Sequence, residues 1–299
     1  MNTASTTYAP APAETPPQVA PPAIDWATVE LPEAWADHLQ FSRLSDLRRL
    51  WRSLSGRERQ PVALPEGMPG AERIPAYVLQ EFHNLPNGNY SRRFSRGYAK
   101  GFDRSMLGTL REGRPRIARA LAGAERALDL GSGAGHLAMA LHAQGIGEVW
   151  GLEPSPYLLQ QAAQAAPQIR WEQGTGEDSR LPSDYFDAVG VCFVFHEVPP
   201  RYLRQILAEL ARITRPGARL AVLEPSPEQW RLGFSSLARR YGWRGLYFRA
   251  LARHVHEPFL DAWHKQDFGA LLAEYGFRLV EDDIGCPFRF FVAERIAGA

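Results

Sequence analysis

The sequence predicts an α/β fold built on a mostly parallel sheet with helices on both faces. Three observations support this. Short apolar runs alternate with helical segments across residues 116–225, a glycine-rich turn follows the first run, and the run at 187–193 is almost wholly apolar. An apolar run of that kind is expected of a strand covered on both faces. Alternation of strands with helices favours a parallel sheet, because each crossover helix returns the chain to the same edge.

Length and composition set the outer limits. The chain has 299 residues, of which 45% are hydrophobic, and a formal net charge of +1. Cys192 and Cys286 are too few for a disulfide framework or a four-thiolate zinc site, so a reduced, cytoplasmic protein is expected. The near-neutral charge gives no global attraction for nucleic acid, and no apolar run approaches the ~20 residues that span a bilayer.

The chain divides into a tail, an extension and a main domain. Residues 1–25 are rich in Pro, Ala and Thr, carry almost no charge and lack the pattern of a secretory signal, which predicts a disordered tail. Residues 26–115 are expected to form a helical N-terminal extension that caps the main domain at 116–299. Residues 226–265 are expected to be a helical lid inserted after the fifth strand.

Within the middle zone, strand and helix patterns follow one another in order. The expected strands are 127–130, 148–153, 170–173, 187–193 and 219–224. The expected helices are 136–144, 156–166 and 201–214. Pro156 suits the first turn of its helix, where its missing N–H would have no partner. Pro216-Gly217 is expected to end the last of these helices.

A glycine-rich turn, Asp129-Leu130-Gly131-Ser132-Gly133-Ala134-Gly135, follows the first strand and opens a helix. Glycines let the backbone turn sharply and approach a ligand, and the helix N-terminus beyond offers free N–H groups. A crevice forms near such a turn in doubly wound sheets, where the strand order reverses. The turn therefore predicts a ligand site at the carboxyl end of the first strand.

The spacing of the glycines indicates which ligand. A dinucleotide fingerprint would place its third glycine at position 136, which is His136. The glycines instead alternate at 131, 133 and 135, with Asp129 two residues earlier. A carboxylate repels a pyrophosphate and attracts a ligand that carries an ammonium and a sulfonium. This pattern favours S-adenosylmethionine (SAM) over a nicotinamide dinucleotide.

Acidic residues follow the second and third strands. Glu153 lies 22 residues after Gly131, where an acidic side chain accepts hydrogen bonds from ribose hydroxyls. The alternative for Glu153 is an exposed strand-end carboxylate. After the third strand, Asp178 is the candidate for the adenine amino group, and Glu177 is the alternative.

Residues 125–225 resemble the class I SAM-dependent methyltransferases. The resemblance rests on the 129–135 turn, Glu153, Gly176–Asp178, Phe186-Asp187 and Arg215-Pro216-Gly217-Ala218. Residues 266–294 extend it with a last helix at 267–275 and a closing hairpin of 278–284 and 288–294. It implies a Rossmann-like sheet of seven strands and methyl transfer from SAM.

The resemblance also implies roles for individual residues. The cofactor-binding candidates are Asp129, Gly131, Ser132, Gly133, Gly135, Glu153, Pro154, Glu177, Asp178 and Phe193. Ser155 or Pro156 is expected beside the adenine ring. The segment 74–90 resembles an N-terminal extension of some bacterial and plastid methyltransferases, where it is expected to cap the cofactor pocket. Tyr77 and Tyr90 therefore become contact candidates.

Candidate catalytic residues leave the fourth strand at its carboxyl end, where α/β sheets place their sites. His196 titrates near neutrality and is the first candidate for a general base, with fixing of the loop as the alternative. Glu197 is the second candidate, with pairing to a nearby helix as the alternative, and Glu224 is expected near the acceptor. Many methyltransferases need no base, because the sulfonium already supplies the leaving group and the protein mainly aligns the reactants.

Two segments outside the common fold carry aromatic and basic residues. Tyr90, Phe94, Tyr98 and Phe102 recur every four residues, which predicts an amphipathic helix that packs on the main domain or closes over the SAM pocket. The insert at 226–265 interleaves aromatics with arginines, a pattern that can bind RNA, a membrane surface or an anionic small molecule. It favours a lid over a small, partly aromatic or acidic acceptor. His254 and His256 have metal-ligand spacing but no third ligand, so no metal is expected.

The sequence thus predicts SAM-dependent methyl transfer to a small-molecule acceptor, with O- or N-methylation favoured, by a monomer or homodimer. Two alternatives stay open: methylation of RNA or protein through the insert, and a SAM-binding module without catalysis. A nucleic-acid partner is disfavoured by the net charge, and a nicotinamide oxidoreductase by the glycine spacing.

Overall fold

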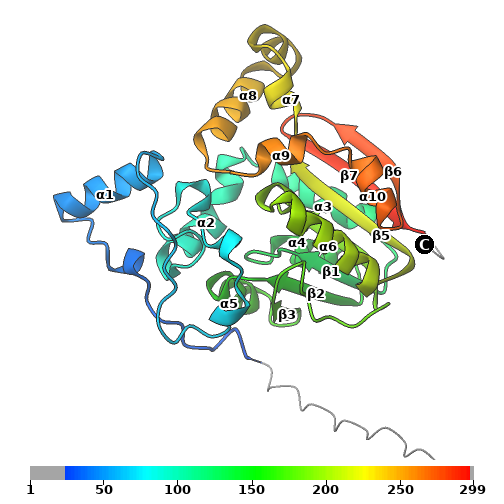
Figure 1. Cartoon of the computed structure of the whole chain (residues 1–299), viewed down its shortest axis with the longest axis horizontal. Coiled ribbons are helices and arrows are strands. Elements are labelled where there is room, and N and C mark those ends of the chain that lie inside the picture. The colour runs from blue at the N-terminus through cyan, green and yellow to red at the C-terminus, as the bar shows by residue number, and fades with distance from the viewer. Residues whose placement is uncertain (1–23, 297–299) are drawn as a thin grey trace, which may run out of the picture.

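The computed structural model describes residues 24–296, so nearly all of the predicted tail at 1–25 lies outside the described residues. Seven strands form one sheet in the order β3-β2-β1-β4-β5-β7-β6 (Figure 1). They are β1 (Arg126–Leu130), β2 (Glu148–Glu153), β3 (Arg170–Gln173), β4 (Phe186–Cys192), β5 (Thr214–Pro225), β6 (Phe277–Ile284) and β7 (Phe288–Arg295). Only β7 runs antiparallel to its neighbours. The predicted seven-stranded, mostly parallel sheet is confirmed.

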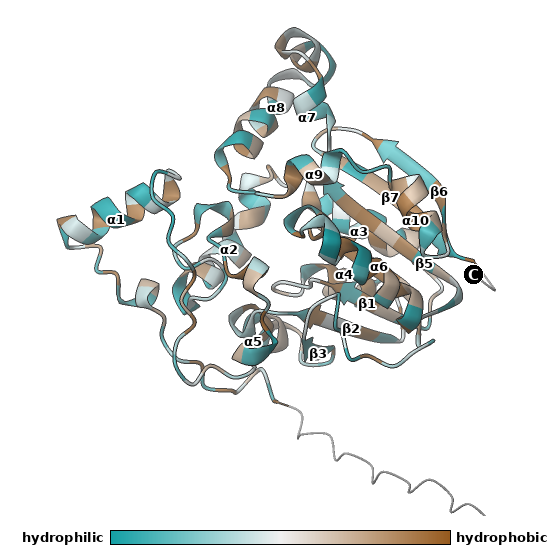
Figure 2. Ribbon diagram, in the orientation of Figure 1, coloured by the Kyte–Doolittle hydropathy of each residue, from teal (hydrophilic) through white to brown (hydrophobic). Residues whose placement is uncertain are grey.

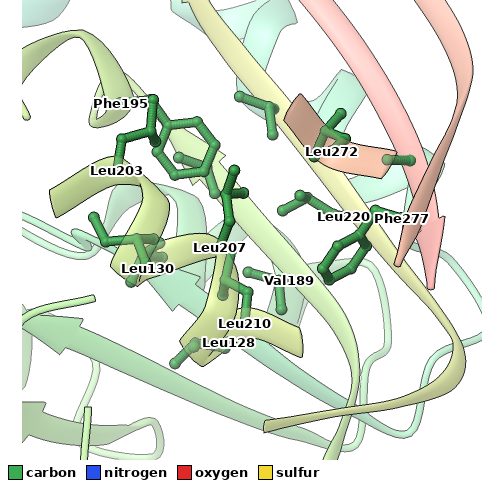
Figure 3. Packing of buried hydrophobic residues seen from close by; sticks show 14 of the residues in the cluster. Leu128, Leu130, Val189, Phe195, Leu203, Leu207, Leu210, Leu220, Leu272 and Phe277 are labelled. Atoms are coloured by element: carbon green, nitrogen blue, oxygen red, sulfur yellow. The ribbon is translucent and has the colours of Figure 1, made fainter. Parts of the chain in front are cut away.

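Helices cover both faces of this sheet. On one face lie α6 (Pro200–Ile213) and α10 (Phe268–Glu274), and on the other α3 (Leu110–Ala120), α4 (His136–Ala143) and α5 (Pro156–Ala165). Figure 3 shows Leu203, Leu207 and Leu210 of α6 packed among side chains of the sheet. The apolar stripe that predicted α6 is therefore the face that it buries, and Figure 2 shows the matching apolar colour along the central strands.

The strand order reverses between β1 and β4. The chain passes outward from β1 to β2 and β3, and then returns to the other side of β1 as β4. Leu130, at the carboxyl end of β1, pairs with Leu152 on one side and Val191 on the other. A crevice opens at this edge because the connections on the two sides of β1 leave in opposite directions.

One predicted boundary was wrong. Helix α6 ends at Ile213, and Thr214 already begins β5, so Pro216-Gly217 does not end the helix. Phe186 pairs with Thr214 and Ala188 with Arg219, which leaves the residues between them as a bulge in β5. The Pro-Gly pair suits this bulge, because proline cannot donate a hydrogen bond to a neighbouring strand.

The N-terminal extension is less helical than predicted. Its regular helices are α1 (Leu44–Leu54) and α2 (Arg92–Ser105). The short 3₁₀ turn η1 (Trp35–His38) precedes α1, and three more lie between the two helices: η2 (Ala71–Arg73), η3 (Ala76–Val78) and η4 (Phe82–Asn84). Five prolines between positions 61 and 86 prevent longer helices there. A small apolar cluster that includes Leu31, Ile74 and Tyr90 attaches the extension to Tyr157 of α5.

The insert after β5 is helical, as predicted, and comprises α7 (Glu228–Arg231), α8 (Phe234–His254) and α9 (Leu260–His264). Helix α8 bends at Gly242, which has a φ of 62°. The Tyr247 hydroxyl donates to the Ser105 carbonyl at the end of α2, 2.7 Å away, so α8 leans on the extension (Figure 1). None of the helices in residues 24–296 combines the length and apolarity that crossing a membrane requires.

Candidate active site

A cavity opens at the carboxyl ends of β1, β2 and β4, where the strand order reverses. We call its lining from the ends of β1 and β2 and from the loops after β1, β2 and β3 the cofactor half. Its residues are Asp129, Gly131, Ser132, Gly133, Glu153, Pro154, Thr175 and Gly176, together with Asn89 and Tyr90 of the N-terminal extension. We call its lining around the β4 loop the acceptor half: Phe82, Tyr98, Phe102, Arg114, Cys192, Phe193 and Glu197.

The three glycines of the turn share a backbone conformation but differ in their surroundings. All three have positive φ, of 66°, 53° and 82° at 131, 133 and 135. A Cβ at Gly131 would lie 2.5 Å from a Val194 methyl carbon, whereas a Cβ at Gly133 would meet no atom within 4 Å. Gly131 therefore allows a close approach between two loops, and Gly133 stands open in the cavity lining.

Gly135 has a packing role. A Cβ there would lie 2.5 Å from the Trp171 ring of β3, and Gly135 is not part of the cavity lining. The structure thus does not bring this predicted cofactor residue to the site. Its missing side chain lets α4 approach β3 closely instead.

Two buried carboxyl groups face the cofactor half. Glu153 accepts hydrogen bonds from the backbone N–H of Gly133 (2.9 Å) and Ser155 (3.0 Å), and Asp129 accepts one from Ala138 (2.8 Å). Burial raises the pKa of each to about 7. Neither forms an ion pair with any residue in the described part of the chain. These carboxyl groups are therefore suited to a ligand that brings positive charge and hydroxyl donors.

The loop after β3 places its acidic side chains outside the lining. Glu177 accepts a hydrogen bond from the Tyr77 hydroxyl (3.0 Å), and Asp178 is exposed and pairs with Arg180 (3.4 Å). A bridge between Thr175 and Asp178 closes the loop into a tight turn, and the cavity meets the chain at Thr175 and Gly176. The structure therefore does not bring Glu177 or Asp178 into the cavity.

The extension, for which the resemblance predicts a cap, contributes side chains to the lining of the cavity. Tyr77, Phe82 and Tyr90 line it, together with Tyr98 and Phe102 of α2. The backbone carbonyl of Asn89, which sequence reasoning missed, accepts from the hydroxyl of Ser155 at 2.6 Å. This bond ties the extension to the amino end of α5.

The insert does not cover the cavity, although a lid was expected from residues 226–265. None of its residues belongs to the lining. Phe248, with the Tyr247 and Leu251 side chains, packs instead into the apolar cluster that contains Leu110 and Met106, beside the extension. Tyr247 and Phe248 of α8 thus pack on this cluster, whereas Phe234 and Trp243 of the same helix are exposed.

Glu224, at the end of β5, holds the loop that follows β4. Its carboxylate accepts from the backbone N–H groups of Val194 and Phe195, both at 2.8 Å, and is fully buried. The same loop contains Phe193, whose φ of 63° is unusual for a side chain of this size. Phe193 lines the cavity and meets the Phe102 ring edge-on. Glu224 therefore fixes the loop that carries Phe193 in the acceptor half.

His196 is bound to Glu224 rather than free. Its Nδ1 lies 2.5 Å from the Glu224 carboxylate, the ring is fully buried, and it is not part of the cavity lining. Burial disfavours the charged ring, but the Glu224 and Glu257 carboxylates outweigh it and raise the pKa of His196 well above its ordinary value. His196 is therefore already protonated at neutral pH, which does not suit a general base.

Glu197, the second catalytic candidate, does line the cavity. Burial and the nearby Glu257 carboxylate raise its pKa to about 8. His83 of η4 places its Nε2 3.3 Å from the Glu197 carboxylate and 3.8 Å from that of Glu257. Burial lowers the pKa of His83 to about 4, so His83 is neutral. Within residues 24–296 no such cluster is arranged to hold a metal ion.

Comparison with known proteins agrees with this geometry. Residues 127–217 match the family described as a methyltransferase domain. An uncharacterised methyltransferase of Synechocystis is 30% identical over 162 residues, which cover 54% of this chain and 70% of that protein. This chain belongs to the class I SAM-dependent methyltransferases. SAM is the cofactor of this family.

Other methyltransferases align over shorter stretches. An uncharacterised methyltransferase of Mycobacterium tuberculosis is 36% identical over 113 residues, covering 38% of this chain and 44% of its own. A 2-phytyl-1,4-naphtoquinone methyltransferase of Synechococcus elongatus is 35% identical over 147 residues, covering 46% and 54%. The alignments thus span about half of the length of these two relatives.

The cofactor half fits SAM. Asp129 and Glu153 offer two buried carboxyl groups to a ligand with a sulfonium, an ammonium and two ribose hydroxyls. Ser132 Oγ and Asn89 Oδ1 are buried polar atoms in the same lining that have no partner in the described residues. Buried polar atoms normally find a partner, so these two atoms are available to a polar ligand.

Proposed function

We propose that this methyltransferase transfers the methyl group of SAM to a small, largely apolar acceptor that carries a hydroxyl or amine proton. The observation that carries the proposal is the acceptor half, in which aromatic side chains surround one titratable carboxyl group. Phe82, Tyr98, Phe102 and Phe193 supply the aromatic wall, and Glu197 supplies the carboxyl.

The charges in the cavity support a small acceptor over RNA. Its lining contains no lysine and a single arginine, Arg114, which is already paired with Asp103 at 2.8 Å. Phosphate recognition needs free basic side chains, and the arginines of the insert lie outside the lining. The names of two relatives, a 2-phytyl-1,4-naphtoquinone methyltransferase and a demethylmenaquinone methyltransferase of Thermus thermophilus, add support for an apolar ring as acceptor.

Glu197 is the proposed base. When bound, SAM supplies an electrophilic methyl group on a positively charged sulfur. A positive charge near Glu197 lowers the pKa of its carboxyl group from about 8 and leaves it ionised at neutral pH. The carboxylate then takes the proton of the acceptor hydroxyl or amine, so that the lone pair left on that atom is free to react.

His83 and His196 are proposed as positioning residues. His83 Nε2 holds the Glu197 carboxyl at 3.3 Å. Protonated His196 and the Glu224 carboxylate together fix the loop that carries Glu197. The aromatic wall keeps water from the reacting atoms and aligns the acceptor ring.

Methyl-labelled SAM and a fractionated cell extract test the proposal. We expect the label to appear in small molecules that partition into organic solvent. Label in RNA or in protein would contradict a small acceptor. SAM binding by calorimetry with no labelled product in any fraction would show a binding module without catalysis. An RNA acceptor would also bind far more weakly at 200 mM than at 50 mM salt.

A further inference from the structure

Helix α1 has its apolar face turned away from the protein. Leu44, Leu47, Trp51 and Leu54 follow one another at helical spacing and form one stripe. Their side chains are 62%, 42%, 54% and 41% exposed, and Phe41 just before the helix is 50% exposed. A surface helix normally turns such a stripe toward the core. Figure 1 shows α1 projecting from the body, and Figure 2 shows its alternating apolar and polar bands.

The polar face of α1 is the one that meets the protein. Ser53 is the buried residue of the helix, and its hydroxyl donates to the Asn84 carbonyl at 3.3 Å. Arg49 donates to Gln60 at 2.9 Å and stacks on the Trp35 ring at 3.9 Å. These contacts fix the orientation of the helix, so the outward apolar stripe is built into the fold.

The segment that carries the stripe is positively charged. Residues 41–59 contain six arginines and two acidic residues, a net charge of +4 in a chain whose total is +1. Arg49 and Arg59 bond to Gln60 and Asn84, so the charge beside the stripe comes from the other four, which are exposed: Arg43, Arg48, Arg52 and Arg57. Arg57 places its guanidinium 4.3 Å above the Trp51 ring, so charge and apolar surface adjoin directly.

We propose that α1 and Phe41 form a docking surface for an anionic lipid bilayer. An interfacial helix combines leucine and tryptophan on one face with arginines that reach the lipid phosphates, and it lies in the plane of the surface. Tryptophan suits the head-group region because its ring is apolar and its N–H remains solvated. The exposed apolar stripe of α1 suits the apolar part of such a bilayer, and the arginines beside the stripe suit its negatively charged surface.

The docking surface is connected to the acceptor half of the cavity. The Leu54 carbonyl accepts from His254 Nε2 at 3.2 Å, and Ser53 contacts Asn84 at the end of η4. The same turn supplies Phe82 to the acceptor half and places His83 against Glu197. If the proposed function holds, docking would present the acceptor half to apolar molecules held in the bilayer. The docking itself does not depend on that function.

Vesicle sedimentation with the full chain tests the docking surface. We expect binding to vesicles of phosphatidylglycerol and phosphatidylcholine, and at least ~10-fold weaker binding to phosphatidylcholine alone. The double substitution Leu47→Ser with Trp51→Ser should reduce binding at least ~10-fold. Val280→Ser is the matched control, because Val280 is 46% exposed on β6, beside acidic residues, and should leave binding unchanged.

Three results would overturn the proposal. The first is absence of binding to the anionic vesicles, and the second is equal binding by the double variant. The third is a dimer in sedimentation velocity that the double variant dissolves without any vesicle binding, which would make α1 a contact between two copies. SAM affinity by calorimetry verifies that each variant is folded. Since lipid binding is measured without methyl transfer, its failure is separate from failure of the proposed function.

Discussion

The two halves of the cavity are assembled in different ways. The cofactor half is built mainly from chain between Asp129 and Gly176, and its central contact joins Gly133 to Glu153, 20 residues away. The acceptor half joins η4, α2 and the β4 loop, and Glu257 behind it comes from the insert. A site made by local chain geometry is visible in a sequence, whereas a site made by convergence of distant segments is not.

The two halves also differ in charge. In the cofactor half, Asp129 and Glu153 accept from backbone donors and form no ion pair with a described residue, although the Arg114 charge is close enough to offset part of the rise that burial causes in the pKa of Asp129. Next to the acceptor half but outside the cavity lining, protonated His196 lies between the Glu224 and Glu257 carboxylates. The carboxyl groups of the first half therefore form no ion pair, whereas those beside the second share a cation supplied by the protein. Variants in each half should therefore produce separable effects.

The largest effect is expected from Glu197→Gln, which keeps the shape of the side chain and removes the base. We expect turnover to fall at least ~100-fold, in the range of general-base catalysis, with little change in SAM affinity. The wild-type kcat/KM for SAM, which reports the free enzyme, should rise with pH through the pKa of about 8, since the carboxylate is the active form. Steady-state kinetics between pH 6 and 9 measure both.

A matched control for this variant is Glu172→Gln on β3, outside the cavity, which should leave turnover unchanged. Unchanged turnover and an unaltered pH profile in Glu197→Gln would remove Glu197 from the role of base. Loss of SAM affinity in the same variant would show that the two halves are not separable.

A smaller effect is expected from Glu153→Gln in the cofactor half. Loss of the buried charge removes a charge-assisted hydrogen bond, so SAM affinity should fall roughly 10- to 100-fold. Turnover at saturating SAM should change much less. Calorimetry with SAM and S-adenosylhomocysteine measures the loss, and an affinity equal to that of the wild type would place the ribose elsewhere.

The stability of the protein should depend on pH because Asp129 and Glu153 are buried carboxyl groups. Asp129 and Glu153 have pKa values raised to about 7, above those of the unfolded chain, so their contribution to stability is lost as pH rises through 7. The pKa values of His196 and Glu197 are also raised, so both groups act in the same direction. Between pH 6.5 and 8.5, the titration of Asp129 and that of Glu153 should each lower the free energy of unfolding by about 1 kcal/mol.

Urea unfolding of the ligand-free protein at these two pH values measures this change. The pKa of His83 is lowered, so its contribution to the stability of the protein is lost only as pH falls below about 6.5. His83 therefore adds little to the change in this window. Glu153→Gln should flatten the dependence. Stability that is constant or rises with pH would show that these carboxyl groups are not destabilised by burial.

The smallest effect is expected from Asp178→Asn. Its side chain is exposed and paired with Arg180 outside the cavity, so SAM affinity should change less than ~2-fold. Calorimetry against the wild type checks this. A loss of 10-fold or more would return Asp178 to the adenine role that its position in the sequence suggested, and would mean that the loop turns inward when SAM binds.

The sequence alone determined the sheet, the helices on its faces and much of the cofactor half. These follow from local rules: apolar periodicity places α6, and the positive φ of Gly131 and Gly133 requires glycine. Even here the sequence did not separate Gly135, which packs on Trp171, from the glycines that face the cavity.

Only the tertiary structure decided the acceptor half. His83 and Glu257 lie 113 and 61 residues from His196 along the chain, so no spacing indicates that they meet. Their pKa values also depend on burial and on neighbours that come from other elements. The outward stripe of α1 has the same origin. Its periodicity is a property of the chain, but which face meets the protein depends on the contacts of Ser53 and Arg49.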